Sequence, residues 1–330
     1  MRYKTEKIAI LVASYNGEKY LGELLDSLLA QSETGWVAYI HDDGSTDGTA
    51  VVIAEYANRY PEKFVCVEGE PSGGAKNNFF FLFRQVEAPL YMCCDQDDVW
   101  LPDKMEKTLR RMRGSRGAES CDPMTGAERE ALCDNVGRTA EIPRLVFSDL
   151  RVADRELHPI ADSMNQYQRL HCEDLAACHL MIENVVVGCT MMVNRALRDR
   201  LIEVTDLTDV VMHDWWAALI AAQFGGIAYL DEATILYRQH GDNEQGARKF
   251  GPSYIMYKLT HSKQAIRGAV EEKQRQARLF AEIYDLPDDS AIRLFGDALD
   301  AGKLRRIRLY RQSGVRKSTF SRNMGLYIFG

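Results

Sequence analysis

Short apolar runs alternate with segments of helical spacing over the first 113 residues of the chain. Continuous apolar runs predict strands at 8–14, 36–40, 64–67 and 89–94. Apolar residues three or four positions apart predict helices at 18–31, 46–58, 76–86 and 101–113. Because such strands need cover on both faces, this order predicts an α/β fold with a mainly parallel sheet flanked by helices.

The pattern changes after this part. Residues 114–143 contain few large apolar side chains and many glycines and charges, which predicts a mobile surface insertion. Apolar segments then predict strands at 145–148 and 235–240, a further apolar run at 185–193, and helices at 213–224 and 250–285. We therefore expect one domain over residues 1–245 and a helical C-terminal extension over residues 246–330.

Composition and charge exclude several classes of protein. The 330 residues are 46% hydrophobic and 27% charged, which is typical of a globular chain. A net charge of -7 argues against a general nucleic-acid binder. The eight cysteines form no C-x-x-C pair, and neither a secretory leader nor a membrane-spanning apolar stretch is visible. These features predict a cytoplasmic protein with reduced thiols.

The last thirty residues differ in charge from the rest. Residues 301–330 contain eight lysines and arginines and no acid, so residues 1–300 carry -15. Aromatic and aliphatic residues are interleaved with these cations. Two interpretations remain open: a solvated, partly disordered end, or a peripheral contact with anionic lipid at the inner face of the cell membrane.

Carboxylates gather where two predicted strands end. Asp42 and Asp43 follow the second strand, and Asp95, Asp97 and Asp98 follow the fourth. In open α/β sheets, ligands bind at the carboxyl ends of strands. Three carboxylates within four residues repel one another, so they favour a bound cation. The alternative is a helix-entry turn in which Asp98 or Asp103 caps the next helix.

Three other segments carry candidate chemistry. The first turn, from Ser14 to Gly17, lacks G-x-G-x-x-G, and no P-loop occurs, which weakens a dehydrogenase or NTPase interpretation. Asp214 lies at a predicted helix start, where the helix dipole would favour an ionised base. The alternative is an N-cap beside two core tryptophans. His240 ends a strand, and a lone histidine is often structural. Ser45 or Thr46 is expected to cap the second helix.

Five segments together resemble a known family. They read VASYNGEKY at 12–20, DDGSTDGT at 42–49, DQDDVWLPDK at 95–104, HDWW at 213–216 and YRQHGDN at 237–243. In this order the chain resembles the bacterial family 2 glycosyltransferases, which have a Rossmann-like GT-A fold, over roughly residues 6–245. It is most similar to the rhamnosyltransferase-like members that build surface polysaccharides.

The resemblance implies a donor site in the N-terminal half. There Asp43 accepts a hydrogen bond from a pyrimidine N3–H, which implies a dTDP- or UDP-sugar. Asp95 faces ribose or metal-bound water, and Asp149 faces the donor sugar. The remaining donor residues implied by the family are Ala13, Ser14 and Tyr15 at the base and ribose, Gly74 and Asn78 beside the nucleotide, and Lys76 at a phosphate.

The resemblance also implies a metal, a catalytic base and an acceptor side. Asp97 is expected to bind Mn²⁺ or Mg²⁺, and His240 to complete the coordination. Asp214 matches the base of inverting members, and with an ordinary carboxyl pKa it needs placement more than tuning. Trp215 or Trp216 would stack on the acceptor sugar, with core packing as the alternative. Asn184 and Gly188 fit an N-x-x-x-G pattern on that side.

The expected function is therefore inverting, metal-dependent transfer of a sugar, L-rhamnose from dTDP-rhamnose, to a saccharide or lipid-linked acceptor in surface polysaccharide synthesis. A UDP-hexose-dependent enzyme of the same family remains an alternative. A sugar-1-phosphate nucleotidyltransferase would show a G-x-G-x-R-like signature after the first strand, where this chain has SYNG. A catalytically silent nucleotide-sugar-binding module is the alternative outside enzymes.

Overall fold

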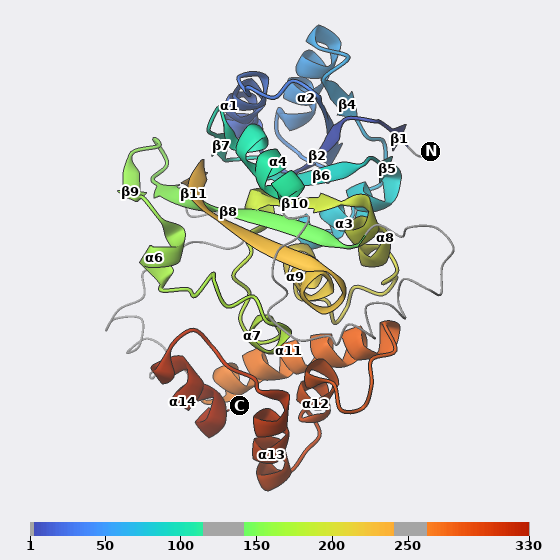
Figure 1. The fold of residues 1–330 in the computed structure, drawn as a ribbon. Helices are drawn as coiled ribbons and strands as arrows, with labels where there is room; N and C mark the ends of the chain where they lie inside the picture. The colour runs from blue at the N-terminus through green and yellow to red at the C-terminus, as the bar shows by residue number, and fades with distance from the viewer. Residues whose placement is uncertain (1–2, 115–141, 241–262, 330) are drawn as a thin grey trace.

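A mixed sheet forms the centre of the molecule in the computed structural model, which describes residues 3–114, 142–240 and 263–329 (Figure 1). Its strand order is β4-β3-β2-β6-β10-β8-β11-β7, with β9 paired to β8. The bounds are β2 Ile8–Ser14, β3 Trp36–Asp42, β4 Phe64–Cys66, β6 Leu90–Asp95, β7 Val99–Trp100, β8 Arg144–Ala153, β9 Pro159–Ala161, β10 Met191–Asn194 and β11 Gly226–Arg238. A separate pair joins β1 Tyr3–Lys4 to β5 Val86–Glu87. The predicted α/β class is confirmed.

The sheet is mixed rather than mainly parallel. Strands β4, β3, β2 and β6 are parallel, as expected. Strand β10 then runs antiparallel to both β6 and β8, and β11 is parallel to β8 but antiparallel to β7. A fully buried strand is apolar throughout in either direction, so its sequence pattern does not reveal how it runs.

Alternate residues of β2 face two different cores, because successive side chains of a strand point to opposite faces. Ile8, Ile10 and Val12 pack with helices α1, α2 and α4. Ala9 and Leu11 face the core that contains α3, α8 and α9. The helix bounds are α1 Glu18–Leu29, α2 Thr49–Arg59, α3 Ala75–Gln85, α4 Lys104–Gly114, α8 Arg195–Leu201 and α9 His213–Phe224. The sheet is thus covered on both faces.

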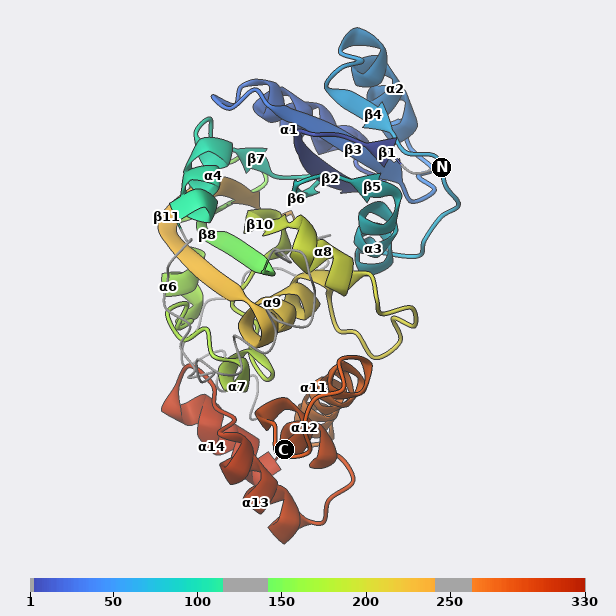
Figure 2. The same ribbon diagram turned by 45° about the vertical axis from the view of Figure 1, so that its right-hand side comes forward.

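The C-terminal extension is built into the second of these cores. It consists of α11 Lys263–Ile283, α12 Ala291–Asp297, α13 Lys303–Ser313 and α14 Phe320–Phe329. Figure 2 shows these helices grouped beyond α9 and the short α7 (Ala177–Leu180). Phe280, Phe295, Tyr310 and Leu326 are buried in one cluster with Trp216 of α9. Residues 301–330 therefore include two helices with buried side chains.

Two predictions fall outside the described residues. Residues 115–141 include nearly all of the expected insertion at 114–143, and residues 241–262 include the expected boundary between 245 and 246. Both stay predictions. Among the helices that the structure describes, none combines the length and the apolar character needed to cross a membrane.

Candidate active site

The loop that follows β2 and the loop that follows β3 are joined by hydrogen bonds. Asn16, with φ 48°, accepts a bond from the Thr46 N–H (2.9 Å) and donates its own N–H to Ser45 Oγ (2.8 Å). The Gly17 N–H donates to Thr49 Oγ1 (2.7 Å). The expected N-cap at Ser45 or Thr46 is wrong, because Ser45 is committed to this contact and α2 begins at Thr49. Most polar residues of the DDGSTDGT segment therefore stabilise the loop after β3.

Asp43 is the residue of that motif that reaches across to the start of α3. Its Oδ1 accepts bonds from Ser72 and Gly73, and its Oδ2 accepts from the Gly74 N–H (2.7 Å). Burial opposes ionisation, but these donors outweigh it and hold the pKa of Asp43 below its ordinary value. A carboxylate offers about four acceptor positions, so Oδ2 retains capacity for one further donor.

Two predicted donor residues are committed elsewhere. The Lys76 Nζ donates to the backbone oxygens of Leu207 and Val210 (both 2.7 Å), rather than pointing to a phosphate site. The Asn78 side chain is 1% exposed and bonds both the ring and the backbone oxygen of His41. The phosphate contact expected of Lys76 is therefore not made in this structure, because sequence spacing does not show which carbonyl groups a loop brings near; the place of Asn78 beside the nucleotide stays a prediction.

Gln96, inside the D-x-D sequence, is a site residue that sequence reasoning missed. Its Oε1 accepts from Ser14 Oγ (2.9 Å) and the Tyr15 N–H (2.8 Å), and its Nε2 donates to the Tyr15 oxygen (2.7 Å). A Cβ at Gly17 would lie 2.2 Å from that Oε1, so a side chain there would displace the Gln96 amide. This clamp fixes the first turn, leaving the Tyr15 side chain 54% exposed beside the expected base site. Ala13 pairs directly with Asp95 across β2 and β6.

The two predicted metal ligands lie together. The distance from His240 Nε2 to Asp97 Oδ2 is 2.6 Å, and the imidazole lies against the Tyr20 ring with 5.0 Å between centroids. Asp98 is fully buried, accepts from the Arg238 N–H (3.3 Å), and burial holds its pKa well above the ordinary value. Since α4 begins at Lys104, Asp98 does not cap it.

Arg238 holds this acidic turn in place, and sequence reasoning missed it too. Its Nε donates to the Asp97 backbone oxygen (2.9 Å), and its guanidinium pairs with Glu23 of α1 (2.5 Å). A further bond joins it to the Arg155 oxygen (2.6 Å). The sequence feature that could have identified Arg238 is its position in the YRQHGDN segment, two residues before His240.

Asp214 lies buried in the first turn of α9. The backbone N–H groups of Trp215 and Gly188 and the Asn184 side chain donate to its carboxylate. Burial nevertheless dominates and raises its pKa to about 7. The expectation of an ordinary, fully ionised carboxylate is therefore wrong, because exclusion of water outweighs the helix dipole. The N-x-x-x-G residues Asn184 and Gly188 hold the predicted base.

A short turn connects this base with the acidic cluster. Gly188 and Cys189 begin the 3-10 turn η1 (Gly188–Thr190). Gly188 lies against Asp214, with 3.7 Å between the Cβ position of Gly188 and the Asp214 Cβ, while the Cys189 thiol lies beside the Asp98 carboxylate. The ligand atoms of Asp95, Asp98 and Cys189 all lie within 4.8 Å of one another. Two successive residues thus bring the predicted base beside the predicted metal-binding turn.

His213 precedes the base and is also enclosed. Its ring lies against Phe79 with 4.1 Å between centroids, and both ring nitrogens are buried without a partner among the described residues. Burial lowers its pKa to about 3, so it is neutral. A Cβ at Gly188 would lie 2.7 Å from its Nε2, which explains the need for glycine there.

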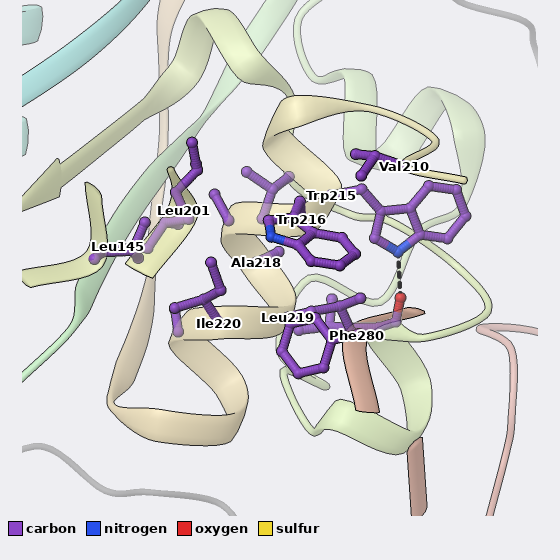
Figure 3. Packing of buried hydrophobic residues seen from close by; sticks show 14 of the residues in the cluster. Leu145, Leu201, Val210, Trp215, Trp216, Ala218, Leu219, Ile220 and Phe280 are labelled. Atoms are coloured by element: carbon purple, nitrogen blue, oxygen red, sulfur yellow. Dashed lines mark hydrogen bonds between the residues drawn. The ribbon is translucent and has the colours of Figure 1, made fainter. Parts of the chain in front are cut away.

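The tryptophans of HDWW pack in the core. Trp216 is 0% exposed and packs edge-on against Phe280 with 5.1 Å between centroids, so it offers no ring face to a sugar (Figure 3). The Trp215 Nε1 donates to the Leu180 oxygen, and Lys273 Nζ lies 5.3 Å from its ring centroid. The core-packing alternative is correct for Trp216.

Asp149 makes several local hydrogen bonds, and its expected place beside the donor sugar stays a prediction. Its Oδ2 accepts from Ser163 Oγ (2.5 Å), the N-cap residue of the short helix α6 (Met164–Gln168), and its Oδ1 accepts from the Leu150 N–H (2.8 Å). This carboxylate therefore supports a loop beside β8.

Comparisons with known proteins agree with this picture. Residues 9–128 match the sequence model of glycosyl transferase family 2. The chain is 27% identical over 266 residues to the dTDP-rhamnosyl transferase RfbG of Shigella flexneri, covering 76% of this chain and 80% of that one. It is 27% identical to an uncharacterized protein of Mycobacterium tuberculosis, of which it spans 59%. The fold matches S. aureus TarS 1–349 in complex with UDP with a TM-score of 0.53 at 16% identity, covering 93% of this chain and 90% of that one.

The fold and these matches define an enzyme that transfers a sugar. The chain is a glycosyltransferase with a GT-A fold, and its residues 9–128 match the model of glycosyl transferase family 2.

Proposed function

We propose that this enzyme transfers L-rhamnose from dTDP-rhamnose, with inversion, to a saccharide or lipid-linked acceptor in bacterial surface polysaccharide synthesis. The observation that carries the proposal is the η1 turn, where Gly188 lies against Asp214 and the Cys189 thiol lies beside Asp98. This turn brings a buried carboxylate with a raised pKa beside the acidic residues at the end of β6. The choice of rhamnose rests on similarity to the Shigella flexneri protein.

In the proposed reaction, Asp214 takes the proton from the acceptor hydroxyl. The hydroxyl oxygen then bonds to the anomeric carbon as the bond from that carbon to the diphosphate oxygen breaks. The nucleoside diphosphate leaves with the electron pair, and the anomeric centre inverts. A base with a pKa near 7 is well matched to such a proton transfer at neutral pH.

Donor recognition would come from the clamped loops. The free acceptor position on Asp43 Oδ2 suits the N3–H of thymine or uracil, a proton that cytosine lacks. The Tyr15 ring is exposed and its backbone is fixed by Gln96, which supports a contact with the base. A pyrimidine diphosphate sugar is therefore the proposed donor.

The residues present fit a divalent cation. Asp97 and His240 bring a carboxylate oxygen and an imidazole nitrogen to 2.6 Å, and Asp95 begins the same turn. Oxygen ligands suit Mg²⁺ and Mn²⁺, and an imidazole favours Mn²⁺. When bound, the cation would neutralise charge on the diphosphate leaving group.

Thermal shift with dTDP, UDP, GDP and CDP, each with Mn²⁺ or EDTA, tests the donor site. A ligand at 100 times its Kd adds about 2.7 kcal/mol of stability. We expect dTDP and UDP to stabilise the protein with Mn²⁺, and Asp43→Asn to lose most of this effect. Stabilisation by GDP would overturn the role of Asp43. Transfer assays with dTDP-rhamnose and UDP-hexoses then decide the sugar.

A UDP-hexose donor is the second candidate. The fold match to a UDP complex and the acceptor position on Asp43 both allow uracil in place of thymine. Turnover of a UDP-hexose in preference to dTDP-rhamnose would favour this candidate. Binding without turnover of any donor would indicate a silent nucleotide-sugar-binding module.

The C-terminal helices support a proposed contact with anionic lipid. Arg305, Arg308 and Arg311 of α13 are exposed, as are Leu304 (85%) and Phe320 (81%). Other tail arginines bind inward instead, as in the pairs Arg316–Asp174 and Arg322–Glu183. Basic residues near anionic lipid contribute about 1 kcal/mol each. We therefore propose a peripheral membrane contact through α13 and do not propose binding of nucleic acid.

Vesicle flotation tests this contact without deleting residues 301–330, whose buried side chains belong to the core. We expect wild type to float with phosphatidylglycerol vesicles and charge reversal of Arg305, Arg308 and Arg311 to glutamate to abolish it. The matched control reverses three exposed arginines of α4, Arg110, Arg111 and Arg113. Equal flotation of both triple variants would overturn the assignment to α13.

A further inference from the structure

The segment between α8 and α9, residues 202–212, leads directly into the turn that carries Asp214. It is tied down from two directions. On one side, Lys76 Nζ donates to the backbone oxygens of Leu207 and Val210 (both 2.7 Å), and an Arg84 guanidinium N–H donates to the Val204 oxygen (2.6 Å). Both cations belong to α3, the helix that begins beside the Asp43 loop.

On the other side, the segment is held by the C-terminal extension. The Val211 N–H donates to Gln276 Oε1 of α11 (2.8 Å), and Gln276 is 0% exposed. An Arg275–Asp209 ion pair (3.2 Å) lies beside this bond at a more exposed position. Val211 precedes His213 by two residues, and the Met212 oxygen accepts the first helical bond of α9, from the Trp216 N–H (3.0 Å).

These contacts differ from ordinary loop packing because they hold backbone atoms close in sequence to Asp214. A buried backbone N–H or carbonyl oxygen that loses its partner costs about 1–3 kcal/mol, so each bond strongly restricts the segment. The bonds from Lys76 and Gln276 fall within seven residues of Asp214 in sequence and come from separate parts of the fold. Movement of the segment would carry the first turn of α9 with it.

We propose that Lys76 and Gln276 are positioning residues that set the place of the Asp214 carboxylate from the donor side and from the C-terminal extension. The proposal rests on the proposed role of Asp214 as the base. It also replaces the expected phosphate contact of Lys76 with a structural contact to residues 207–210. Through its bond to residues 202–212, the C-terminal extension thereby becomes part of the catalytic apparatus.

The first test compares two glutamines of α11. Gln276 bonds the segment, whereas Gln274, 2% exposed, donates to Tyr310 OH (3.2 Å) inside the extension. Each change to leucine removes one buried amide, so both variants are expected to lose similar stability. We expect Gln276→Leu to lower kcat about 10- to 100-fold with the donor KM unchanged, and Gln274→Leu to leave kcat within about twofold. Gln276→Glu, which keeps an acceptor for the Val211 N–H, should recover part of the loss.

The second test compares two lysines that donate to loop carbonyls. Lys63 Nζ bonds the Thr34 oxygen (2.7 Å) far along the sequence from α9, so Lys63→Met is the control for Lys76→Met. We expect Lys76→Met to lower kcat while calorimetry with dTDP and Mn²⁺ gives an unchanged Kd. A weaker Kd with unchanged kcat would overturn the proposal and restore the phosphate role.

The outcomes separate this proposal from the proposed function. If Asp214→Asn retains transfer, the base assignment itself is wrong. If Asp214→Asn is inactive and Gln276→Leu behaves as Gln274→Leu does, Asp214 is the base but the positioning roles are wrong. If Gln276→Leu fails to fold, the comparison of Lys76→Met with Lys63→Met still tests whether the segment positions Asp214.

Discussion

Replacing Asp214 with asparagine should abolish transfer and at the same time stabilise the protein above neutral pH. Burial raises the pKa of this carboxyl from 3.8 to about 7. At about 1.36 kcal/mol per pKa unit, the folded state then bears a cost of roughly 4 kcal/mol when the group ionises. Asparagine keeps the shape and hydrogen-bonding oxygen of the side chain but never ionises.

The sign of the pH dependence follows from the direction of that pKa change. The unfolded chain releases this proton near pH 4, while the folded protein holds it up to about pH 7. The free energy of unfolding contributed by Asp214 therefore falls as the pH rises from about 4 through 7. We expect Asp214→Asn to match wild type at pH 4–5 and to exceed it by roughly 2–4 kcal/mol at pH 8–9.

Activity should show the opposite trend. Below pH 7 the base is protonated, so kcat should rise about tenfold per pH unit and level off above pH 7. The asparagine variant should lose about 100- to 10,000-fold in kcat with dTDP affinity unchanged. Urea unfolding at pH 5 and pH 8.5, together with a pH profile of kcat, measures both effects. Equal stability of the two proteins at pH 8.5 would refute the buried charge, and transfer within tenfold of wild type would refute the base.

Three further predictions concern the surrounding residues. Asp97→Ala should remove Mn²⁺-dependent dTDP binding in calorimetry, while His240→Ala should weaken Mn²⁺ affinity less; identical titrations to wild type would return both to structural roles. Gly188→Ala places a Cβ 2.7 Å from His213 Nε2, so kcat should fall more than about tenfold and the melting temperature should drop. Gln96→Ala frees the first turn, and the Kd for dTDP should rise about tenfold; an unchanged Kd would show that the clamp does not shape the donor site.

Local apolar patterns predicted most of the elements. The strand Ile8–Ser14 and the helix His213–Phe224 have the expected bounds. Only the end of β11 was expected, at 235–240, because Asp231 and Glu232 interrupt its apolar residues where the two register shifts begin. The sequence also could not predict the direction of β10, since the pattern of a strand of four buried residues does not depend on its direction.

Site residues that belong to recognisable motifs could be predicted from the sequence. Properties that depend on how the chain packs around a residue could not. The family resemblance implied that Asp97 and His240 lie together, and their side chains are 2.6 Å apart. The raised pKa of Asp214 does not follow from the sequence, because it depends on how completely other elements exclude water. The roles of Lys76 and Gln96 were hidden for a related reason: each binds backbone atoms of a segment distant in sequence, and backbone atoms leave no sequence signature.

The shared cluster of Trp216, Phe280 and Phe224 has a consequence for how such enzymes diversify. Phe280 lies 5.1 Å from Trp216 and 6.1 Å from Phe224, measured between ring centroids, so α11 fits the side chains of α9 directly. A chimera that took residues 263–330 from another transferase would have to reproduce this fit, or leave large aromatic surfaces of α9 in water. The extension therefore cannot be exchanged freely as a separate module, and changes in it must arise together with changes in α9.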